Sequence, residues 1–218
     1  MEILKTLLDL FLHLDKHLAA IIQQYGTVTY VLLFVVIFME TGLVVTPFLP
    51  GDSLLFAAGT FAALGNLNFW LLFVLLAFAA VLGDSVNYWI GHLIGKRAYT
   101  GEIKFIKKEY IERTHAFFEK YGGKTIFLAR FVPIVRTFAP FVAGVGEMSY
   151  SYFFTYNVVG GITWVFLFTT TGYFFGNMPI IKENFSLAIM VIILISLLPA
   201  VYEWVRSRQE NKKVAQAN

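Results

Sequence analysis

Four charged residues interrupt two otherwise apolar stretches of the sequence. Glu40 and Asp52 lie in the first stretch, and Arg130 and Arg136 lie in the second. An ionisable group at membrane depth costs on the order of several kcal/mol unless it faces a cavity or a partner, so a functional role is the first interpretation. Guanidinium groups bind phosphate oxygens in a planar fork, and buried carboxyl groups can exchange protons. The four residues predict a site that binds an anionic lipid headgroup and exchanges protons.

The composition places these stretches in a membrane. The chain has 218 residues, of which 58% are hydrophobic and 14% charged, and its mean hydropathy is +0.69. A soluble domain of this size is much less hydrophobic. The sequence has no cysteine, which excludes disulfides and thiolate metal ligands. We therefore expect an all-α integral membrane protein with one domain, 1–218, and about three full transmembrane helices, at 67–95, 150–176 and 185–205.

Prolines and glycines divide each charged stretch into two short helices. Proline removes a backbone donor and disfavours helix in the residue before it. The resulting arms are too short to cross a bilayer. We therefore predict two re-entrant hairpins, 28–64 and 125–146, that each enter and leave on one side. The predicted breaks are Pro47, Pro50 and Gly51 in the first hairpin and Pro133 and Pro140 in the second.

The two halves of the chain repeat the same order of elements. An amphipathic interfacial helix, at 3–24 or 105–121, precedes each hairpin, and a glycine-containing span follows it. Such a repeat of broken helices is typical of a transporter with its binding site at mid-membrane, and we expect the halves to be inverted. The many basic residues of 96–124 and of the tail, 206–218, place both segments in the cytoplasm by the positive-inside rule.

Each charged residue also has an alternative structural interpretation. Arg130 and Arg136 could extend to the cytoplasmic interface, or they could only pair with Glu40 and Asp52 and hold the hairpins together. Asp52 also fits a helix cap. Asp84, in the 67–95 segment, fits either a third proton relay or a hydrogen-bonded helix contact.

Other chemistry has weaker support in the sequence. Asp9, His13 and His17 share one helix face, but a solvated polar face is commoner than a metal site. No histidine lies near either charged stretch, and no Ser/His/Asp arrangement is present, so a nucleophile or base for catalysis is missing. We expect no enzymatic activity, no metal or cofactor, and no nucleic-acid partner.

The motifs around these residues resemble the DedA family of bacterial inner-membrane proteins, within the VTT/SNARE-associated superfamily that also includes eukaryotic lipid scramblases. The similarity covers essentially the whole chain, and the proline and charge positions agree in both hairpins. It rests on Glu40-Thr41-Gly42, Pro47-Phe48-Leu49-Pro50-Gly51-Asp52-Ser53-Leu54-Leu55, Gly83-Asp84-Ser85-Val86-Asn87-Tyr88, Gly122-Gly123-Lys124-Thr125 and the segment from Arg130 to Gly144.

The resemblance implies two opposed re-entrant hairpins in the bacterial inner membrane. It also implies a role in returning undecaprenyl phosphate, the carrier lipid of cell-wall synthesis, across that membrane, with links to proton motive force. The family's two acids correspond to Glu40 and Asp52, and its two arginines correspond to Arg130 and Arg136.

We therefore expect a proton-coupled flippase in which Arg130 and Arg136 hold a lipid phosphate while Glu40 and Asp52 exchange protons. Its partners would be membrane lipids, undecaprenyl phosphate and protons, and a homo-oligomer is compatible with this role. Two alternatives stay open. One is a proton-coupled cation or drug antiporter whose acids bind the substrate, and the other is a non-transporting envelope assembly factor whose charges only stabilise the fold.

Overall fold

A computed structural model describes most of the two charged stretches and the helices between them. It covers residues 14–43, 51–99 and 122–176, together with Phe118, Met178, Pro179, Ile181, Leu187, Met190 and Val191. Several predictions therefore lie wholly or mostly outside the described residues. They are the breaks at Pro47 and Pro50, the start of the 3–24 helix, the polar face with Asp9 and His13, the 105–121 helix, the 185–205 span and the tail, 206–218.

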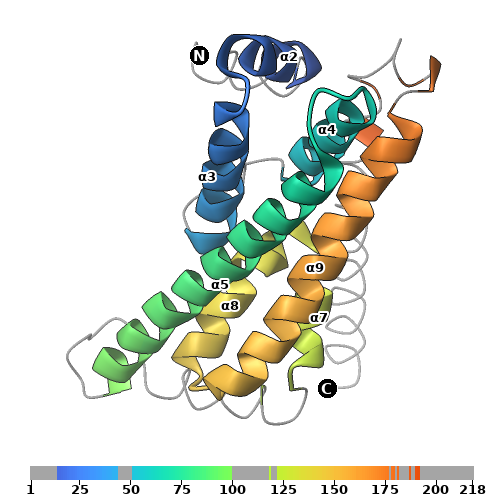
Figure 1. Cartoon of the computed structure of the whole chain (residues 1–218). Helices are drawn as coiled ribbons and strands as arrows, with labels where there is room; N and C mark the ends of the chain where they lie inside the picture. Colours follow the sequence, from blue (N-terminus) through green and yellow to red (C-terminus); the bar gives the residue numbers. More distant parts are fainter. Residues whose placement is uncertain are drawn as a thin grey trace, which may run out of the picture.

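The described residues form helices and no strand, which confirms the predicted all-α fold. In chain order the helices are α2 (Leu14–Tyr25), α3 (Val28–Gly42), α4 (Gly51–Ala63), α5 (Phe69–Tyr99), α7 (Lys124–Ala129), α8 (Pro133–Val145) and α9 (Tyr150–Phe175). Figure 1 shows that α2, α3 and α4 lie in one half of the molecule and that α7 and α8 lie in the other.

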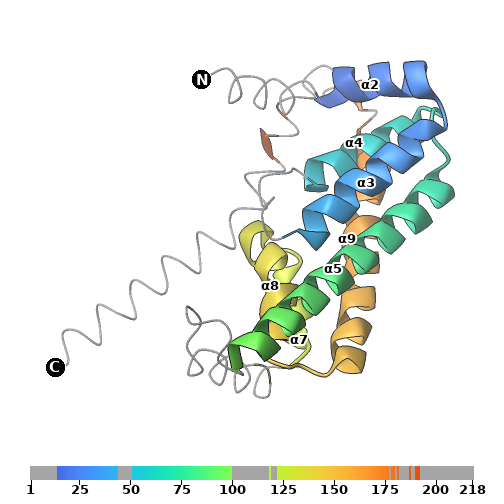
Figure 2. The ribbon, with the colours of Figure 1, turned by 90° about the vertical axis from the view of Figure 1, so that its left-hand side faces the viewer.

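Helices α5 and α9 are the two long helices among the described residues. They contain 31 and 26 residues, and their most apolar windows have mean hydropathies of 2.2 and 1.4. Both are therefore long and apolar enough to cross a bilayer. They lie side by side and run in opposite directions (Figures 1 and 2). The predicted spans at 67–95 and 150–176 are confirmed as helices.

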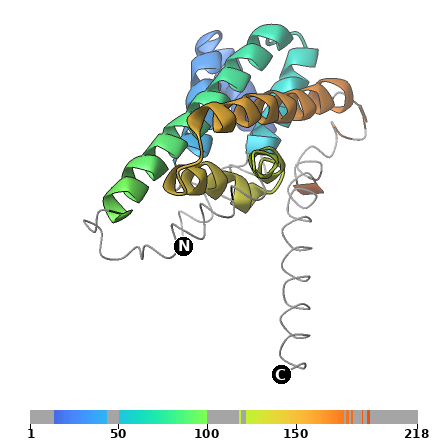
Figure 3. The ribbon, with the colours of Figure 1, turned by 90° about the horizontal axis from the view of Figure 1, so that it is seen from below.

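Two pairs of short helices pack against this long pair. Helix α5 contacts α3 and α8, whereas α9 contacts α4 and α7. Seen from below, α7 and α8 lie together at one end of the molecule (Figure 3). The α3–α4 and α7–α8 pairs coincide with the predicted hairpins 28–64 and 125–146. That each pair enters and leaves the membrane on the same side stays a prediction.

The break in the second pair comes from one proline and not from two. Val132 has an extended backbone, with φ −119° and ψ 104°, and Pro133 is the first residue of α8. This is the conformation that proline imposes on the residue before it. The prediction that Pro140 also opens the hairpin is wrong, because Pro140 lies inside α8. An interior proline removes one helical hydrogen bond, and the remaining bonds and the packing on α5 carry the helix past it.

Close helix contacts show that the two halves are related by an inverted repeat. Where α4 meets α9, small residues let the backbones touch, and the same contacts recur at a constant offset where α8 meets α5. In the same order of elements, α3 packs on α5 and α7 packs on α9. Because α5 and α9 run in opposite directions, the repeat is inverted, as predicted. The corresponding contacts are Phe56–Gly172 and Phe141–Gly91, Gly59–Thr169 and Gly144–Tyr88, and Thr60–Gly176 and Val145–Gly95.

Candidate functional site

The helix pairs bring all five singled-out ionisable residues into one buried cluster. Glu40 lies in the last turn of α3 and Asp52 in the first turn of α4. Arg130 directly follows α7, whereas Asp84 lies in the middle of α5. Glu40 and Arg130 are each only 2% exposed. Neither Arg130 nor Arg136, whose side chain is 9% exposed, therefore extends to an interface.

Arg136, in the first turn of α8, joins the two acids of the first helix pair. Its Nη2 atom lies 2.5 Å from Glu40 Oε1, and its Nη1 atom lies 2.5 Å from Asp52 Oδ1. Trp164 of α9 completes this site. Its indole N–H donates to Asp52 Oδ1 over 2.8 Å, and its ring centroid lies 4.8 Å from Arg136 Cζ. The guanidinium group is thus bound at its edge by two carboxylates and on its face by an aromatic ring.

Glu40 is held where a negative charge is otherwise unfavourable. It lies at the C-terminal end of α3, where the helix dipole is negative. The backbone N–H of Gly51, at the start of α4, donates to Glu40 Oε1 over 3.1 Å and, with Arg136, offsets this cost. A Cβ atom on Gly51 would come within 1.9 Å of Glu40 Oε2, so glycine is required for the carboxylate to pack there. Glu40 Oε2 is buried and has no hydrogen-bond partner within the described residues.

Arg130 has different partners. Its Nη2 atom lies 2.5 Å from Asp84 Oδ2 and donates to Asn157 Oδ1, also over 2.5 Å, and to the Ala80 carbonyl over 3.3 Å. Asn157 in turn donates from Nδ2 to the Val81 carbonyl. Among the described residues, Arg130 Nε is buried without a hydrogen-bond partner. Asp84 is therefore the ion-pair partner of Arg130, which agrees with a hydrogen-bonded contact between helices, whereas its role as a proton relay stays a prediction.

Asn87 ties the two helix pairs together next to these ion pairs. It lies on α5, and its Nδ2 atom donates to the carbonyl of Thr41 over 3.1 Å and to the carbonyl of Thr137 over 2.8 Å. The Thr41 carbonyl belongs to the last turn of α3, where helical acceptors lack intrahelical donors. One amide side chain thus connects the end of α3 with α8.

The cluster has more acids than bases. Three carboxyl groups, from Glu40, Asp52 and Asp84, face two guanidinium groups. Counted over the described residues, the five ionised groups leave one negative charge uncompensated in a buried region, where the charged form of a carboxyl group is costly. Binding one proton balances the cluster. The arrangement can therefore exchange a proton, and its arginines can exchange a carboxylate partner for another anion.

The sequence identified the charged residues that the structure brings together, but it missed two of their partners on α9. Arg130 and Arg136 lie on opposite sides of the break at Pro133, as predicted. Arg136 pairs with both acids of the first hairpin, as the structural alternative expected, but Arg130 pairs with Asp84. Asn157 and Trp164 were not singled out, although a lone amide in the middle of an apolar span is a signal of a buried hydrogen-bond network.

Comparison with known proteins gives a consistent family. The VTT domain family matches residues 49–174. The chain is 51% identical to Protein DedA of Escherichia coli (strain K12) over 218 residues, which cover 99% of this chain and 100% of that protein. It is 46% identical to an uncharacterized membrane protein of Mycobacterium leprae over 168 residues, covering 77% of this chain and 75% of that protein. No solved structure matches.

A more distant relative locates the protein in the cell. The chain is 32% identical to Inner membrane protein YqjA of Escherichia coli (strain K12) over 203 residues, covering 93% of this chain and 92% of that protein. With two membrane-spanning helices among its described residues, the chain is a multi-pass protein of the bacterial inner membrane. The charged cluster lies within a chain that belongs to the DedA family of VTT-domain membrane proteins.

Proposed function

We propose that this protein moves a lipid phosphate across the bacterial inner membrane in a proton-linked cycle, with undecaprenyl phosphate as the leading candidate. The observation that carries the proposal is the buried cluster of two arginines and three carboxyl groups, four of them at the ends of the short helices and Asp84 in the middle of α5. Arginine forks suit phosphate oxygens, and an intramembrane cluster of this kind is the usual mark of an ion or substrate pathway.

The ion pairs themselves provide a way to couple the headgroup to a proton. Arg136 is occupied by Glu40 and Asp52, so an incoming phosphate has to replace a carboxylate. A proton that binds Glu40 makes it neutral and weakens its hold on the guanidinium group, since charge-assisted hydrogen bonds are roughly twice as strong as neutral ones. The freed donors then bind phosphate oxygens. When the headgroup leaves, Glu40 releases its proton and pairs with Arg136 again.

The inverted repeat supports access from both membrane faces. Each half supplies a broken helix pair and one long helix, and the cluster lies where the two halves meet. In transporters with such repeats, movement of one half against the other exposes a central site to alternate sides. In this cycle the charged headgroup crosses within the protein while the hydrocarbon part of the lipid stays in apolar surroundings.

Transport into reconstituted vesicles tests the proposal. Purified protein is placed in vesicles with labelled undecaprenyl phosphate in one leaflet, and its appearance in the other leaflet is followed with and without a pH gradient. The parent protein should move the lipid, and the gradient should change the rate. Arg136→Lys should bind the lipid phosphate markedly more weakly although the protein still accumulates, because a point charge does not replace the bidentate fork.

The proton step is tested by Glu40→Gln in the same vesicles. Glutamine keeps the shape and the hydrogen bonding of the side chain but cannot release a proton. We expect this variant to bind lipid phosphate and to lose the dependence of transport on the pH gradient. If Glu40→Gln responds to the gradient as the parent does, Glu40 is not the coupling group, and Asp52 or Asp84 becomes the candidate.

A second candidate function uses the excess of one negative charge in another way. In a proton-coupled cation or drug antiporter, the carboxyl groups of Glu40 and Asp52 would bind a cationic substrate in exchange for protons. The same vesicles loaded with a quaternary ammonium dye distinguish the two functions. Only the antiporter would use a proton gradient to drive transport of the dye. Movement of neither compound would favour the assembly-factor alternative.

A further inference from the structure

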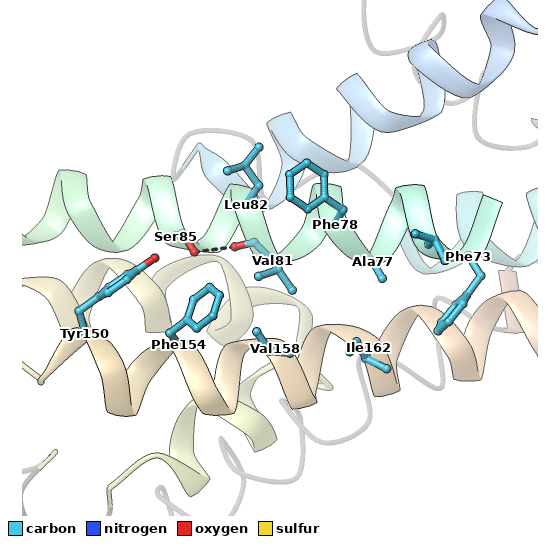
Figure 4. Close-up of a pocket in the computed structure, with 11 residues that line it drawn as sticks. Phe73, Ala77, Phe78, Val81, Leu82, Ser85, Tyr150, Phe154, Val158 and Ile162 are labelled. Carbon is cyan, nitrogen blue, oxygen red and sulfur yellow. Dashed lines mark hydrogen bonds between the residues drawn. The ribbon is translucent and has the colours of Figure 1, made fainter. Parts of the chain in front are cut away.

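An apolar groove of about 450 Å³ lies between the two long helices (Figure 4). Its walls are the α5 residues Phe73, Ala77 and Val81 and the α9 residues Phe154, Val158 and Ile162. The rim is open, and Ile162, for example, is 43% exposed. Both helices are long and apolar enough to cross a bilayer, so we expect this apolar opening to face the hydrocarbon interior and not water.

The groove lies on the symmetry axis of the inverted repeat. The offset that relates the helix contacts of α5 to those of α9 pairs Phe73 with Phe154, Ala77 with Val158, and Val81 with Ile162. All six residues line the groove, so each half of the repeat contributes an equivalent wall. The two ends of the groove nevertheless differ, because Ser85 and Tyr150 line one end, whereas their counterparts at the same offset, Phe166 and Phe69, do not line the other.

Only a thin layer separates the groove from the Arg130 guanidinium group. Gly161 has no side chain, and a Cβ atom there would lie 3.0 Å from Val81 Cγ2 and 3.3 Å from Arg130 Nη2. Val81 of the groove wall and the Arg130 guanidinium group thus both lie next to Gly161 of α9. Ser85, which also lines the groove, lies 3.3 Å from the Asn157 amide that binds Arg130.

We propose that this groove binds the hydrocarbon chain of the transported lipid and that the phosphate headgroup reaches Arg130 between Val81 and Gly161. The inference rests on the proposed function. A lipid phosphate needs an apolar surface for its chain beside a cationic partner for its headgroup. Here the apolar walls and Arg130, which is buried with its Nε atom unpartnered among the described residues, lie back to back. The headgroup replaces Asn157 as the ligand of Arg130, and the rest of a long chain stays in the bilayer.

Photochemical crosslinking of the unaltered protein tests where the chain lies. The probe is a polyprenyl phosphate with a diazirine in its hydrocarbon chain, bound to protein in vesicles and mapped by mass spectrometry of the labelled peptides. Labels should concentrate in residues 73–85 of α5 and 150–162 of α9. An excess of unlabelled polyprenyl phosphate should remove them. Specific labels elsewhere, with these two segments unlabelled, would overturn the proposal.

A groove-filling substitution provides the second test, with a control on the same helix. Ile162→Trp places a large side chain in the groove, whereas Leu167→Trp alters a residue of α9 that is 48% exposed and lies outside it. Ile162→Trp should weaken binding of the long-chain polyprenyl phosphate by about tenfold, the effect of losing roughly two buried methylene contacts. Leu167→Trp should leave it unchanged.

A short-chain alkyl phosphate separates this inference from the proposed function. Ile162 contributes no polar contact to the charged cluster, so Ile162→Trp should bind the short-chain probe as the parent does. If the parent binds neither probe, the proposed function is wrong. If the parent binds both and Ile162→Trp binds the long chain equally well, the function stands and the groove is not the chain site. Should Ile162→Trp fail to fold, the crosslinks in the unaltered protein decide.

Discussion

The two buried arginines, only six positions apart in the sequence, have different charge environments. Arg136 is bound by two carboxylates and stacked on Trp164, so its surroundings carry one excess negative charge. Arg130 is bound by one carboxylate, one amide and one carbonyl group, so its surroundings are balanced. The comparison teaches that a shared residue type does not imply a shared role. In the proposed cycle, a proton on Glu40 frees donors of Arg136 for the phosphate, whereas at Arg130 the phosphate replaces the neutral ligand Asn157.

The largest expected effect is a loss of stability when Arg136, the arginine that pairs with two acids, is replaced. Arg136→Leu leaves Glu40 and Asp52 buried together without a cation, and removing one partner of a buried ion pair costs about 3–5 kcal/mol. The midpoint of thermal unfolding in detergent should fall sharply. Arg130→Leu leaves a single carboxyl group, Asp84, and should lower the midpoint less. Combining Arg136→Leu with Glu40→Gln and Asp52→Asn should recover part of the loss, and equal losses from both single variants would contradict the comparison.

Replacing a glycine with alanine should lower the stability of the protein at the Arg136 site and should not lower it at the Arg130 site. Gly51→Ala places a Cβ atom 1.9 Å from Glu40 Oε2 and should cost about 1–3 kcal/mol through overpacking. Gly160→Ala, beside Arg130, meets its nearest atoms at 3.4 Å, which is ordinary contact. Because alanine favours a helix over glycine, this variant should unfold at the same or a higher temperature than the parent. A destabilised Gly160→Ala protein would mean that the Arg130 site is packed as tightly as the Arg136 site.

Asn157→Asp should make the Arg130 site resemble the Arg136 site. The second carboxylate on Arg130 competes with an incoming phosphate, so we expect binding of undecaprenyl phosphate to weaken by about tenfold. Asn157→Leu is the control, since it removes the same hydrogen bonds without adding charge. Binding to detergent-solubilised protein measures both variants. Equal affinity of the Asp and Leu variants would show that charge at this position does not control the headgroup.

The smallest effect is expected where Trp164 supports Arg136. Trp164→Phe removes the indole donor to Asp52 but keeps an aromatic ring against the guanidinium group, so the loss of unfolding free energy should be about 1 kcal/mol. Trp70→Phe, at a position that is 67% exposed, should change it by less than about 0.5 kcal/mol. Chemical denaturation followed by fluorescence measures both. If the two variants behave alike, Trp164 does not stabilise the Arg136 site.

Much of the fold followed from local signals in the chain. The spans at α5 and α9 were predicted from the length of their apolar runs, and the break before α8 was predicted from Pro133. Pro140 misled the prediction because the cost of an interior proline, a lost hydrogen bond and a steric clash worth about 3 kcal/mol, is local to one turn of the helix. Such a cost is small compared with the packing of a whole helix on α5, and packing is not visible in sequence.

The sequence by itself determined that this is a membrane protein and that its charged residues are exceptional. Both conclusions depend on the free energy of moving a residue from water into an apolar medium, which each side chain carries wherever it lies. Only the tertiary structure decided which arginine meets which acid. Pairs such as Arg136 with Glu40, or Arg130 with Asp84, join residues far apart in the chain, and their contact depends on how α5 and α9 pack against the short helices. Asn157 and Trp164 also belong to the site only because α9 packs against the other helices.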